Sequence, residues 1–114
     1  MPSFHAWEAK ISASDATPFQ KKVWMAMVRI PKGKVATYAQ VAARIGKPNA
    51  ARAVGNACNA NPFAPDVPCH RVIASSGKLG GFAFGIKEKV KLLTQEKVRI
   101  VNGKIAPENI LTKW

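Results

Sequence analysis

Acidic residues are scarce in this chain of 114 residues, which holds 6 Asp and Glu against 18 Lys and Arg and has a formal net charge of +12. Cysteine is scarce too. Two cysteines cannot supply a four-thiolate zinc site or a multi-bridge disulfide framework, so we expect a reduced, intracellular protein. No run of about 18 apolar residues exists, and residues 1–10 lack a basic-then-apolar leader. We therefore expect neither a membrane protein nor a secreted one.

Length and apolar content indicate one folded domain. A domain commonly has roughly 100–150 residues, and 47% of the residues here are hydrophobic. That share is too high for a disordered basic tail. We expect residues 18–114 to form the domain and residues 1–17, which include a short Ser/Ala/Asp/Thr segment, to form a lead-in.

Positive charge is concentrated in one stretch, because no Asp or Glu occurs between Ala16 and Pro65. Like charges repel one another, and nucleic acid is the commonest partner that offsets this repulsion. A merely soluble basic protein remains an alternative, whereas an acidic membrane surface is disfavoured because no strongly apolar helix face accompanies the charge. The cations of this stretch are Lys21, Lys22, Arg29, Lys32, Lys34, Arg44, Lys47 and Arg52.

Apolar spacing predicts a helix over residues 18–30, with Pro18 in its first turn and Pro31 ending it. Its apolar face consists of Phe19, Val23, Met27 and Ile30.

Two short helices are predicted next. Thr37 and Gln40 match a capping box, in which each side chain binds the other residue's free backbone N–H. The helix that they open ends at Gly46, and its buried face is predicted as Val41, Ala42 and Ile45. Asn49 is predicted to cap a second helix over residues 50–58. Two short helices joined by a tight Gly/Pro turn are typical of a helix-turn-helix.

The second of these helices has an unusual composition, since its exposed positions are mostly Ala, Gly and Asn and Arg52 is its only charge. A helix that reads bases in the major groove would carry several Arg, Asn or Gln side chains. We interpret this helix as fitting a groove by shape, with Arg52 as a single projecting side chain. An Ala-rich helix packed on both sides is the alternative.

The C-terminal half predicts short loops and one more helix. A proline-bounded loop over residues 62–68 leads into residues 69–73, a turn follows at 75–78, and residues 80–85 are glycine-rich. The helix after them is predicted to bury one face, formed by Ile86, Val90 and Leu93.

An Asn-Gly pair at residues 102–103 lies between two short apolar segments and favours a type I′ hairpin. Such a pair of strands beside a helix-turn-helix would form a small wing. The sequence therefore predicts a mainly α fold with small β elements, a winged helix-turn-helix DNA-binding domain.

Cys69, His70 and Arg71 form the most reactive combination in the sequence. A cysteine reacts as its thiolate and so needs a base or cations nearby. Neighbours on a strand point to opposite faces, so a Cys69–His70 interaction requires a turn, a one-turn helix or a bridging water. The alternative is that Cys69 is a buried apolar side chain beside a hydrogen-bonded histidine.

No metal site is predicted, because the available ligands do not have zinc-finger spacing. The second cysteine, Cys58, is interpreted as a packing residue. The ligands considered are His5, Cys58, Cys69 and His70.

The segment Pro68–Val72 resembles the active-site motif of the O6-alkylguanine-DNA alkyltransferases, also called methylated-DNA–protein-cysteine methyltransferases. The resemblance extends over roughly residues 18–98. It includes residues 37–38, 50–55, 61–62 and 80–81 at matching separations.

This resemblance implies five catalytic residues. Cys69 would accept the alkyl group, and His70 would take its proton through a water. Glu96, in the predicted last helix, would orient and polarise His70. Asn61 would hold the turn that places the active-site segment. Tyr38 would rotate a DNA phosphate and donate a hydrogen bond to the leaving guanine.

The same resemblance implies how DNA is bound. Arg52 would enter the base stack from the minor groove and fill the space left by the flipped nucleotide. The other DNA-binding residues would be Thr37, Gln40, Ala50, Ala51, Gly55 and Ser75. The base pocket would be lined by Tyr38, Val72, Phe82 and Ala83, the last two standing where the commoner family pattern has Tyr and Ser.

The function implied is DNA repair by direct reversal, in which O6-methylguanine in duplex DNA transfers its methyl group once and irreversibly to Cys69. We expect a monomer in the cytoplasm, nucleoid or nucleus that needs no cofactor and has no membrane partner. A related alternative is an alkyltransferase-like protein, which binds the damaged base without transfer and recruits excision-repair proteins. Family members usually carry a further N-terminal domain that alkyltransferase-like proteins lack, but those proteins also replace the cysteine that is present here as Cys69. A helix-turn-helix transcription regulator is a second alternative.

Overall fold

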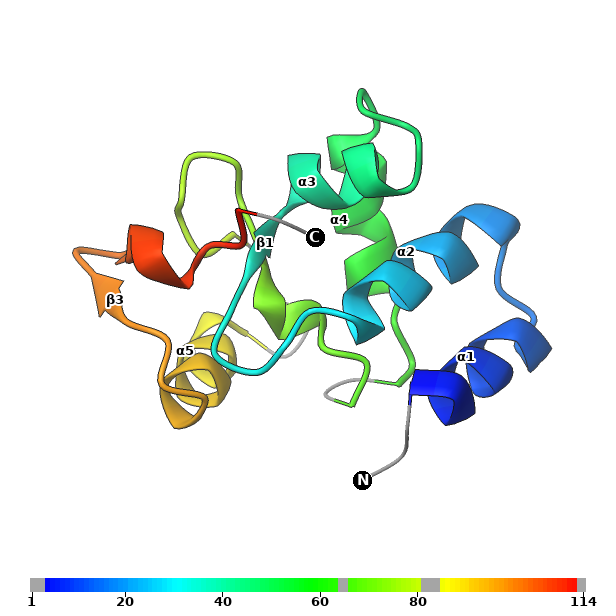
Figure 1. The fold of residues 1–114 in the computed structure, drawn as a ribbon, viewed down its shortest axis with the longest axis horizontal. Helices are drawn as coiled ribbons and strands as arrows, with labels where there is room; N and C mark the ends of the chain where they lie inside the picture. The colour runs from blue at the N-terminus through cyan, green and yellow to red at the C-terminus, as the bar shows by residue number, and fades with distance from the viewer. Residues whose placement is uncertain (1–3, 64–65, 81–84, 113–114) are drawn as a thin grey trace.

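The computed structural model describes residues 4–63, 66–80 and 85–112. Helices dominate these residues, and the strands are short, which confirms the predicted mainly α fold (Figure 1). The α-helices are α1 (Phe4–Ala13), α2 (Pro18–Val28), α3 (Tyr38–Arg44), α4 (Ala51–Asn59) and α5 (Ile86–Gln95). The strands are β1 (Ala36–Thr37), β2 (Val72–Ile73), β3 (Ile100–Val101) and β4 (Lys104–Ile105), and two 3₁₀ helices are η1 (Cys69–Arg71) and η2 (Pro107–Asn109).

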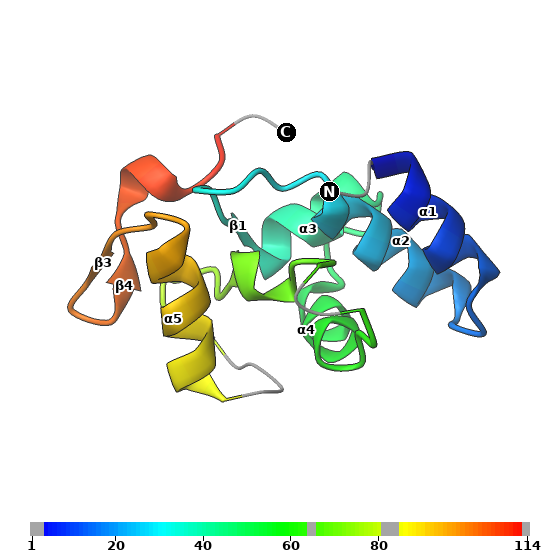
Figure 2. The ribbon, with the colours of Figure 1, turned by 90° about the horizontal axis from the view of Figure 1, so that it is seen from below.

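Helix α1 was not anticipated within the segment expected to be a lead-in. It packs on α2, and its residue Ile11 is fully buried in the core. Helix α2 starts with a capping box between Thr17 and Gln20 and ends at Val28, slightly before the predicted end. The two helices form one end of the molecule in Figures 1 and 2, and α5 with the β3–β4 hairpin forms the other.

The helix-turn-helix of α3 and α4 is confirmed. The Thr37 hydroxyl accepts a hydrogen bond from the Gln40 N–H at 3.0 Å, and the Gln40 amide oxygen accepts one from the Thr37 N–H at 2.8 Å. Gly46 follows α3 with a φ of +79°, a conformation that favours glycine. The prediction that Asn49 caps α4 is wrong. The N–H of Ala50 binds the Lys47 carbonyl in a turn, so Ala50 becomes the residue before the helix.

A continuous apolar core joins the first four helices to η1. The Trp24 indole N–H of α2 donates to the Ala57 carbonyl of α4 at 2.9 Å. Next to this contact, the Cys58 sulfur lies 3.5 Å from the Met27 sulfur. Both cysteines are free thiols, and the interpretation of Cys58 as a packing residue is confirmed.

The C-terminal hairpin is also confirmed: Asn102 and Gly103 have φ values of +53° and +77°, as a type I′ turn requires. In α5, however, the predicted apolar face is wrong at Ile86, which is 47% exposed. Leu93 is buried as expected, and Lys89 is the other buried residue of this helix. The helix is therefore rotated so that a lysine faces the interior.

Strand β1 pairs in parallel with β2, with Ala36 opposite Val72 and Thr37 opposite Ile73. Thr37 directly precedes α3, and Val72 directly follows η1. This short ladder therefore joins the start of the helix-turn-helix to the segment that carries Cys69.

Candidate active site

Cys69 and His70 lie on η1, a one-turn helix, which is one of the three arrangements that the sequence left open for a Cys–His interaction. The turn follows Pro68, whose carbonyl accepts a hydrogen bond from the Arg71 N–H at 2.9 Å. Both side chains are nearly enclosed, since Cys69 is 4% exposed and His70 is 1% exposed. A buried histidine beside a buried thiol can act as its base.

Glu96 contacts His70 directly, with 3.1 Å between the imidazole Nε2 and the carboxylate Oε2. Burial opposes ionisation of Glu96, but hydrogen bonds and charges from Arg71 and His70 lower its pKa to about 2. An ionised carboxylate only accepts hydrogen bonds, so Nε2 carries the proton. The Glu96 position differs slightly from the prediction, because it caps the C-terminus of α5 instead of lying within the helix.

The other imidazole nitrogen, Nδ1, is buried and makes no hydrogen bond to any described residue. Because Nε2 donates its proton to Glu96, Nδ1 is the nitrogen of the ring that can accept a proton. The ring thus has its basic nitrogen available for a proton.

Asn61 secures the loop that precedes Cys69. Its side-chain N–H donates to the Val67 carbonyl at 2.7 Å, and its side-chain oxygen accepts from the Phe63 N–H at 2.9 Å. Burial raises the pKa of Cys69, while a hydrogen bond from Asn61 and the charge of Lys89 oppose that rise. Asn61 therefore fixes the loop that leads into Cys69.

Lys89 is a feature of the site that sequence reasoning missed. It is 0% exposed, and its Nζ donates to the Val72 carbonyl at 2.8 Å. Burial lowers its pKa to about 8, although the possible negative charges of Cys58 and Cys69 oppose this shift. Only its position on α5, one residue before the predicted apolar Val90, could have hinted at burial.

The sequence indicates no separate role for Arg71 beyond its place in the motif, yet this residue binds Glu96 through two hydrogen bonds. Its Nε donates to Oε1 at 2.8 Å, and its Nη2 donates to Oε2 at 2.6 Å. Its Nη1 donates to the Ile30 carbonyl at 2.8 Å. The residue after the histidine therefore links η1 to the ends of both α5 and α2.

Tyr38 is half-buried at the first position of α3, between two glycines. A Cβ added to Gly55 would lie 3.9 Å from the ring atom Cζ, and one added to Gly80 would lie 3.0 Å from the hydroxyl oxygen. Burial and the nearby cysteines raise the pKa of Tyr38. The phenol therefore stays protonated at neutral pH and can donate a hydrogen bond.

Helix α4 buries one face and exposes the other, which excludes the alternative of a helix packed on both sides. Arg52 is exposed, Ala50, Ala51 and Gly55 are half-buried, and Ser75 is exposed in the turn after β2. Thr37 and Gln40 bind each other in the capping box, and the Gln40 Nε2 also donates to the Leu111 carbonyl at 2.7 Å.

Of the residues expected at the base pocket, Val72 is buried next to η1. Phe82 and Ala83 lie outside the described residues. Besides burial, the charge of Cys69 raises the pKa of Tyr38, and the charge of Lys89 opposes the effect of burial on the pKa of Cys69, so residues of α3 and α5 both act on the thiol of η1.

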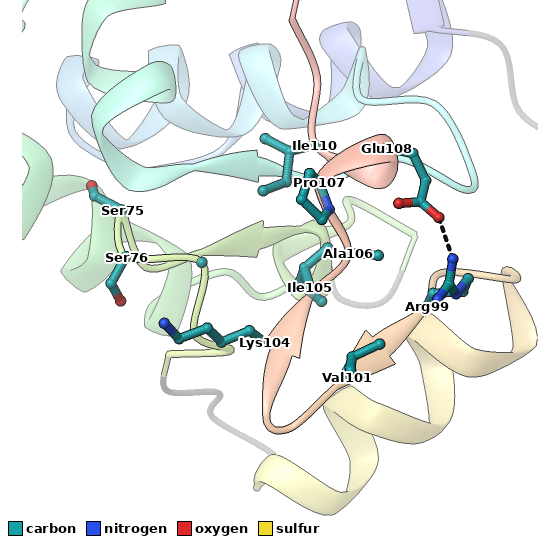
Figure 3. A pocket seen from close by; sticks show the side chains of 11 residues that line it. Ser75, Ser76, Arg99, Val101, Lys104, Ile105, Ala106, Pro107, Glu108 and Ile110 are labelled. Carbon is teal, nitrogen blue, oxygen red and sulfur yellow. Dashed lines mark hydrogen bonds and ion pairs between the residues drawn. The ribbon is translucent and has the colours of Figure 1, made fainter.

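A separate cleft of about 470 Å³ lies between the turn after β2 and the C-terminal hairpin (Figure 3). Ser75, Ser76 and Lys104 line it, together with the Arg99–Glu108 ion pair. It contains neither Cys69 nor His70, so it is not where the thiol reacts.

Two further properties bear on function. Across residues 4–63, 66–80 and 85–112, every helix is too short or too polar to span a bilayer. The same residues contain no group of three or more His, Cys, Asp and Glu side chains that could hold a metal ion.

Curated relatives are similar in sequence to this chain over most of its length. The methylated-DNA–protein-cysteine methyltransferase of Salmonella typhimurium is 52% identical over 85 residues, which is 75% of this chain and 50% of the relative. The enzyme of Methanosarcina barkeri is 53% identical over 85 residues, 75% of this chain and 54% of the relative. The chain thus spans about half the length of these curated relatives.

Solved structures show the same likeness. Mycobacterium tuberculosis OGT in complex with DNA is 52% identical with a TM-score of 0.71, over 72% of this chain and 51% of that one. Schizosaccharomyces pombe Atl1, in complex with damaged DNA containing O6-carboxymethylguanine, is 32% identical with a TM-score of 0.75, over 88% of this chain and 100% of that one.

Most of the chain also matches the description of one protein family. Residues 18–98 match the 6-O-methylguanine DNA methyltransferase, DNA binding domain. This match includes the helix-turn-helix, η1 and Glu96. The chain therefore belongs to the 6-O-methylguanine DNA methyltransferase family.

Proposed function

We propose that this protein repairs DNA by direct reversal, taking the alkyl group from O6-alkylguanine in a single turnover. The observation that carries the proposal is the buried Cys69–His70 turn, with His70 bound to an ionised Glu96. These groups can remove a thiol proton, and they lie within residues 18–98, which match the 6-O-methylguanine DNA methyltransferase, DNA binding domain.

The chemistry balances without a cofactor. His70 takes the Cys69 proton at Nδ1, through a water, and the thiolate attacks the alkyl carbon. An S–C bond forms as the C–O6 bond breaks, and the electron pair goes to the guanine. Tyr38, kept protonated by its raised pKa, donates a hydrogen bond to the leaving base and stabilises its developing charge. The thioether has no good leaving group, so each molecule reacts once.

DNA is bound by the exposed face of α4. A base inside a duplex is out of reach of the thiol and must be extruded, at a cost of roughly a few kcal/mol. Arg52 projects from α4 and takes the place of the extruded base. Ala50, Ala51 and Gly55 allow close approach to the minor groove, Ser75 contacts the backbone, and Thr37 and Gln40 hold the start of α3.

The base pocket completes the proposal. Val72 and Tyr38 form the described part of its wall, and Phe82 and Ala83 are proposed to complete it. A helix with small exposed side chains reads no bases, which suits a repair protein and disfavours a transcription regulator. The domain is proposed to comprise residues 18–114, acting as a monomer where the cell keeps its DNA, the nucleoid or the nucleus.

A second candidate function is recognition of the lesion without transfer. Its support is the likeness to Atl1, whose whole length is matched by 88% of this chain. Excision-repair proteins would then be the partners. The presence of Cys69 beside His70 and Glu96 favours transfer.

The deciding experiment is to incubate the protein with duplex DNA containing O6-methylguanine and measure its intact mass. We expect a gain of one methyl group, located on Cys69 by peptide mapping. Cys69→Ser should abolish the gain, and Cys58→Ala, which changes the other buried thiol, should retain it. Tight binding of the damaged duplex with no mass change would favour the second candidate.

A further inference from the structure

Arg71 and His70 are consecutive residues of η1 that bind the same carboxylate. The Glu96 Oε2 atom lies 2.6 Å from the Arg71 Nη2 and 3.1 Å from the His70 Nε2. Its other oxygen, Oε1, accepts from the Arg71 Nε at 2.8 Å. The guanidinium therefore holds both carboxylate oxygens, and the imidazole shares one of them.

This arrangement is enclosed, which limits how the carboxylate can move. The side chains of Arg71 and Glu96 are 14% and 11% exposed. Two parallel N–H···O bonds define both the position and the plane of a carboxylate, as a single contact does not. Glu96 lies at the C-terminal cap of α5, and the Arg71 guanidinium binds both of its carboxylate oxygens, so Arg71 orients the side chain.

The guanidinium is itself anchored to the core. Its Nη1 donates to the carbonyl of Ile30, a fully enclosed residue just after α2. One side chain therefore sets the distance between the ends of α2 and α5, with η1 between them.

The tautomer of His70 follows from this geometry. A carboxylate that stays ionised and stays in place accepts the proton of Nε2, leaving Nδ1 as the acceptor nitrogen. If the carboxylate could rotate away, the ring would lose that constraint and either nitrogen could carry the proton.

We propose that Arg71 is a positioning residue of alkyl transfer, which fixes Glu96 so that His70 keeps its proton on Nε2 and leaves Nδ1 bare. Its role in the reaction rests on the proposed function above. Its role in fixing the imidazole does not, because that role can be observed without any transfer.

The first test is the ¹⁵N NMR spectrum of His70, which distinguishes the two neutral tautomers. We expect protonated Nε2 and bare Nδ1 in the unmodified protein, and a mixture in Arg71→Met. Arg71→Lys keeps the charge but only part of the fork geometry, so it should give an intermediate spectrum. Arg99→Met, which removes the exposed Arg99–Glu108 pair, is the matched control and should leave the spectrum unchanged.

The second test is the single-turnover rate of methyl transfer from duplex DNA. Arg71→Met should slow transfer by on the order of 10- to 100-fold, the size of loss found when the partners that orient metal-bound histidines are removed. Duplex affinity should be unchanged, since Arg71 faces the interior. Combined with Glu96→Gln, the Arg71→Met change should cost less than about threefold more, because it acts through the carboxylate.

An unchanged rate in Arg71→Met, or an equal loss with and without Glu96→Gln, would overturn the proposal. If Arg71→Met does not fold, as judged by circular dichroism, the same cycle with Arg71→Lys decides. If the unmodified protein transfers nothing, the proposed function fails, and the tautomer measurement still decides the role of Arg71. A bare Nε2 in the unmodified protein, or the same tautomer in every variant, would then refute it.

Discussion

Tyr38 and Gly80 are in contact across the candidate site, so closely that a Cβ on Gly80 would lie 3.0 Å from the phenol oxygen. The same Cβ would lie 3.4 Å from the backbone nitrogen of Ala74. Gly80 also has a φ of +72°, where side chains other than glycine are strained. The position of the Tyr38 hydroxyl, the proposed hydrogen-bond donor, thus depends on a residue without a side chain at position 80.

We predict that Gly80→Ala destabilises the protein by about 1–3 kcal/mol through backbone strain and also slows methyl transfer by displacing the Tyr38 hydroxyl. Urea unfolding and the single-turnover rate measure the two effects. Gly77→Ala is a close control, since Gly77 has a φ of +88° but no atom within 4 Å of its added Cβ. Gly77→Ala should lose stability and keep its rate. Equal slowing in both variants would contradict a role for the Tyr38 contact.

Lys89 should set the pH at which Cys69 becomes reactive. Because the Lys89 charge lowers the pKa of Cys69 against the effect of burial, Lys89→Met should move the thiol reaction to higher pH. The influence should be strongest below about pH 8, where Lys89 is protonated. The measurement is the rate of Cys69 modification by iodoacetamide as a function of pH, in a Cys58→Ala background.

Lys87 provides the control for this prediction, because it is exposed on the same helix. Lys87→Met should leave the pH profile of Cys69 unchanged. If Lys89→Met and Lys87→Met behave alike, the buried cation has no specific effect on the thiol.

Glu96 should contribute stability that depends on pH. Its pKa of about 2 is below the ordinary value of 4.5, so the folded state binds its proton less readily than the unfolded state. The contribution is complete above about pH 4.5 and is lost as the pH falls toward 2. Glu96→Gln should therefore destabilise at neutral pH, and its difference from the unmodified protein should shrink in acid. Urea unfolding at both pH values tests this, and a constant difference would contradict it.

Glu96→Gln should also slow methyl transfer without weakening duplex binding, because the Glu96 side chain is only 11% exposed and contacts His70. Single-turnover kinetics and a binding titration separate the two effects. An unchanged transfer rate would argue against the carboxylate–imidazole arrangement as part of the reaction.

Arg52→Ala should slow reaction with damaged duplex by roughly tenfold or more, because the cost of extruding a base is no longer offset. Reaction with free O6-benzylguanine should stay the same, since that base needs no extrusion. Lys47→Ala, at an exposed position just before α4, should weaken duplex binding without this selectivity. Equal losses on duplex and free base in Arg52→Ala would remove the extrusion role.

Local signals in the sequence were sufficient where short-range chemistry decides the structure. The Thr37–Gln40 capping box and the Asn102–Gly103 turn each depend on side chains and backbone within a few residues, and both are present. The sequence indicates what a Cys–His interaction would need but not that a turn forms there, because a 3₁₀ turn after Pro68 carries no periodic signal.

Long-range contacts could not be predicted in the same way. Lys89 is buried because the Val72 carbonyl, on a distant strand, takes its hydrogen bond, and no pattern within α5 shows this. The Arg71–Glu96 contact likewise joins residues that only the fold brings together. Asn49 is a residue type that commonly caps helices, but the turn closed by the Ala50 N–H and the Lys47 carbonyl places Ala50 at the N-cap position instead.

The parallel ladder of β1 and β2 has a consequence for how such a protein can change. Backbone hydrogen bonds, which among single substitutions only proline removes, hold the start of α3 beside the segment that carries Cys69. The exposed surface of α4, which we propose binds DNA, can therefore be altered, in evolution or by design, while the position of Cys69 stays constant. An insertion in either strand would have the opposite effect. It would shift the β1–β2 register, so that the proposed DNA-binding surface is kept but Cys69 no longer reaches the damaged base.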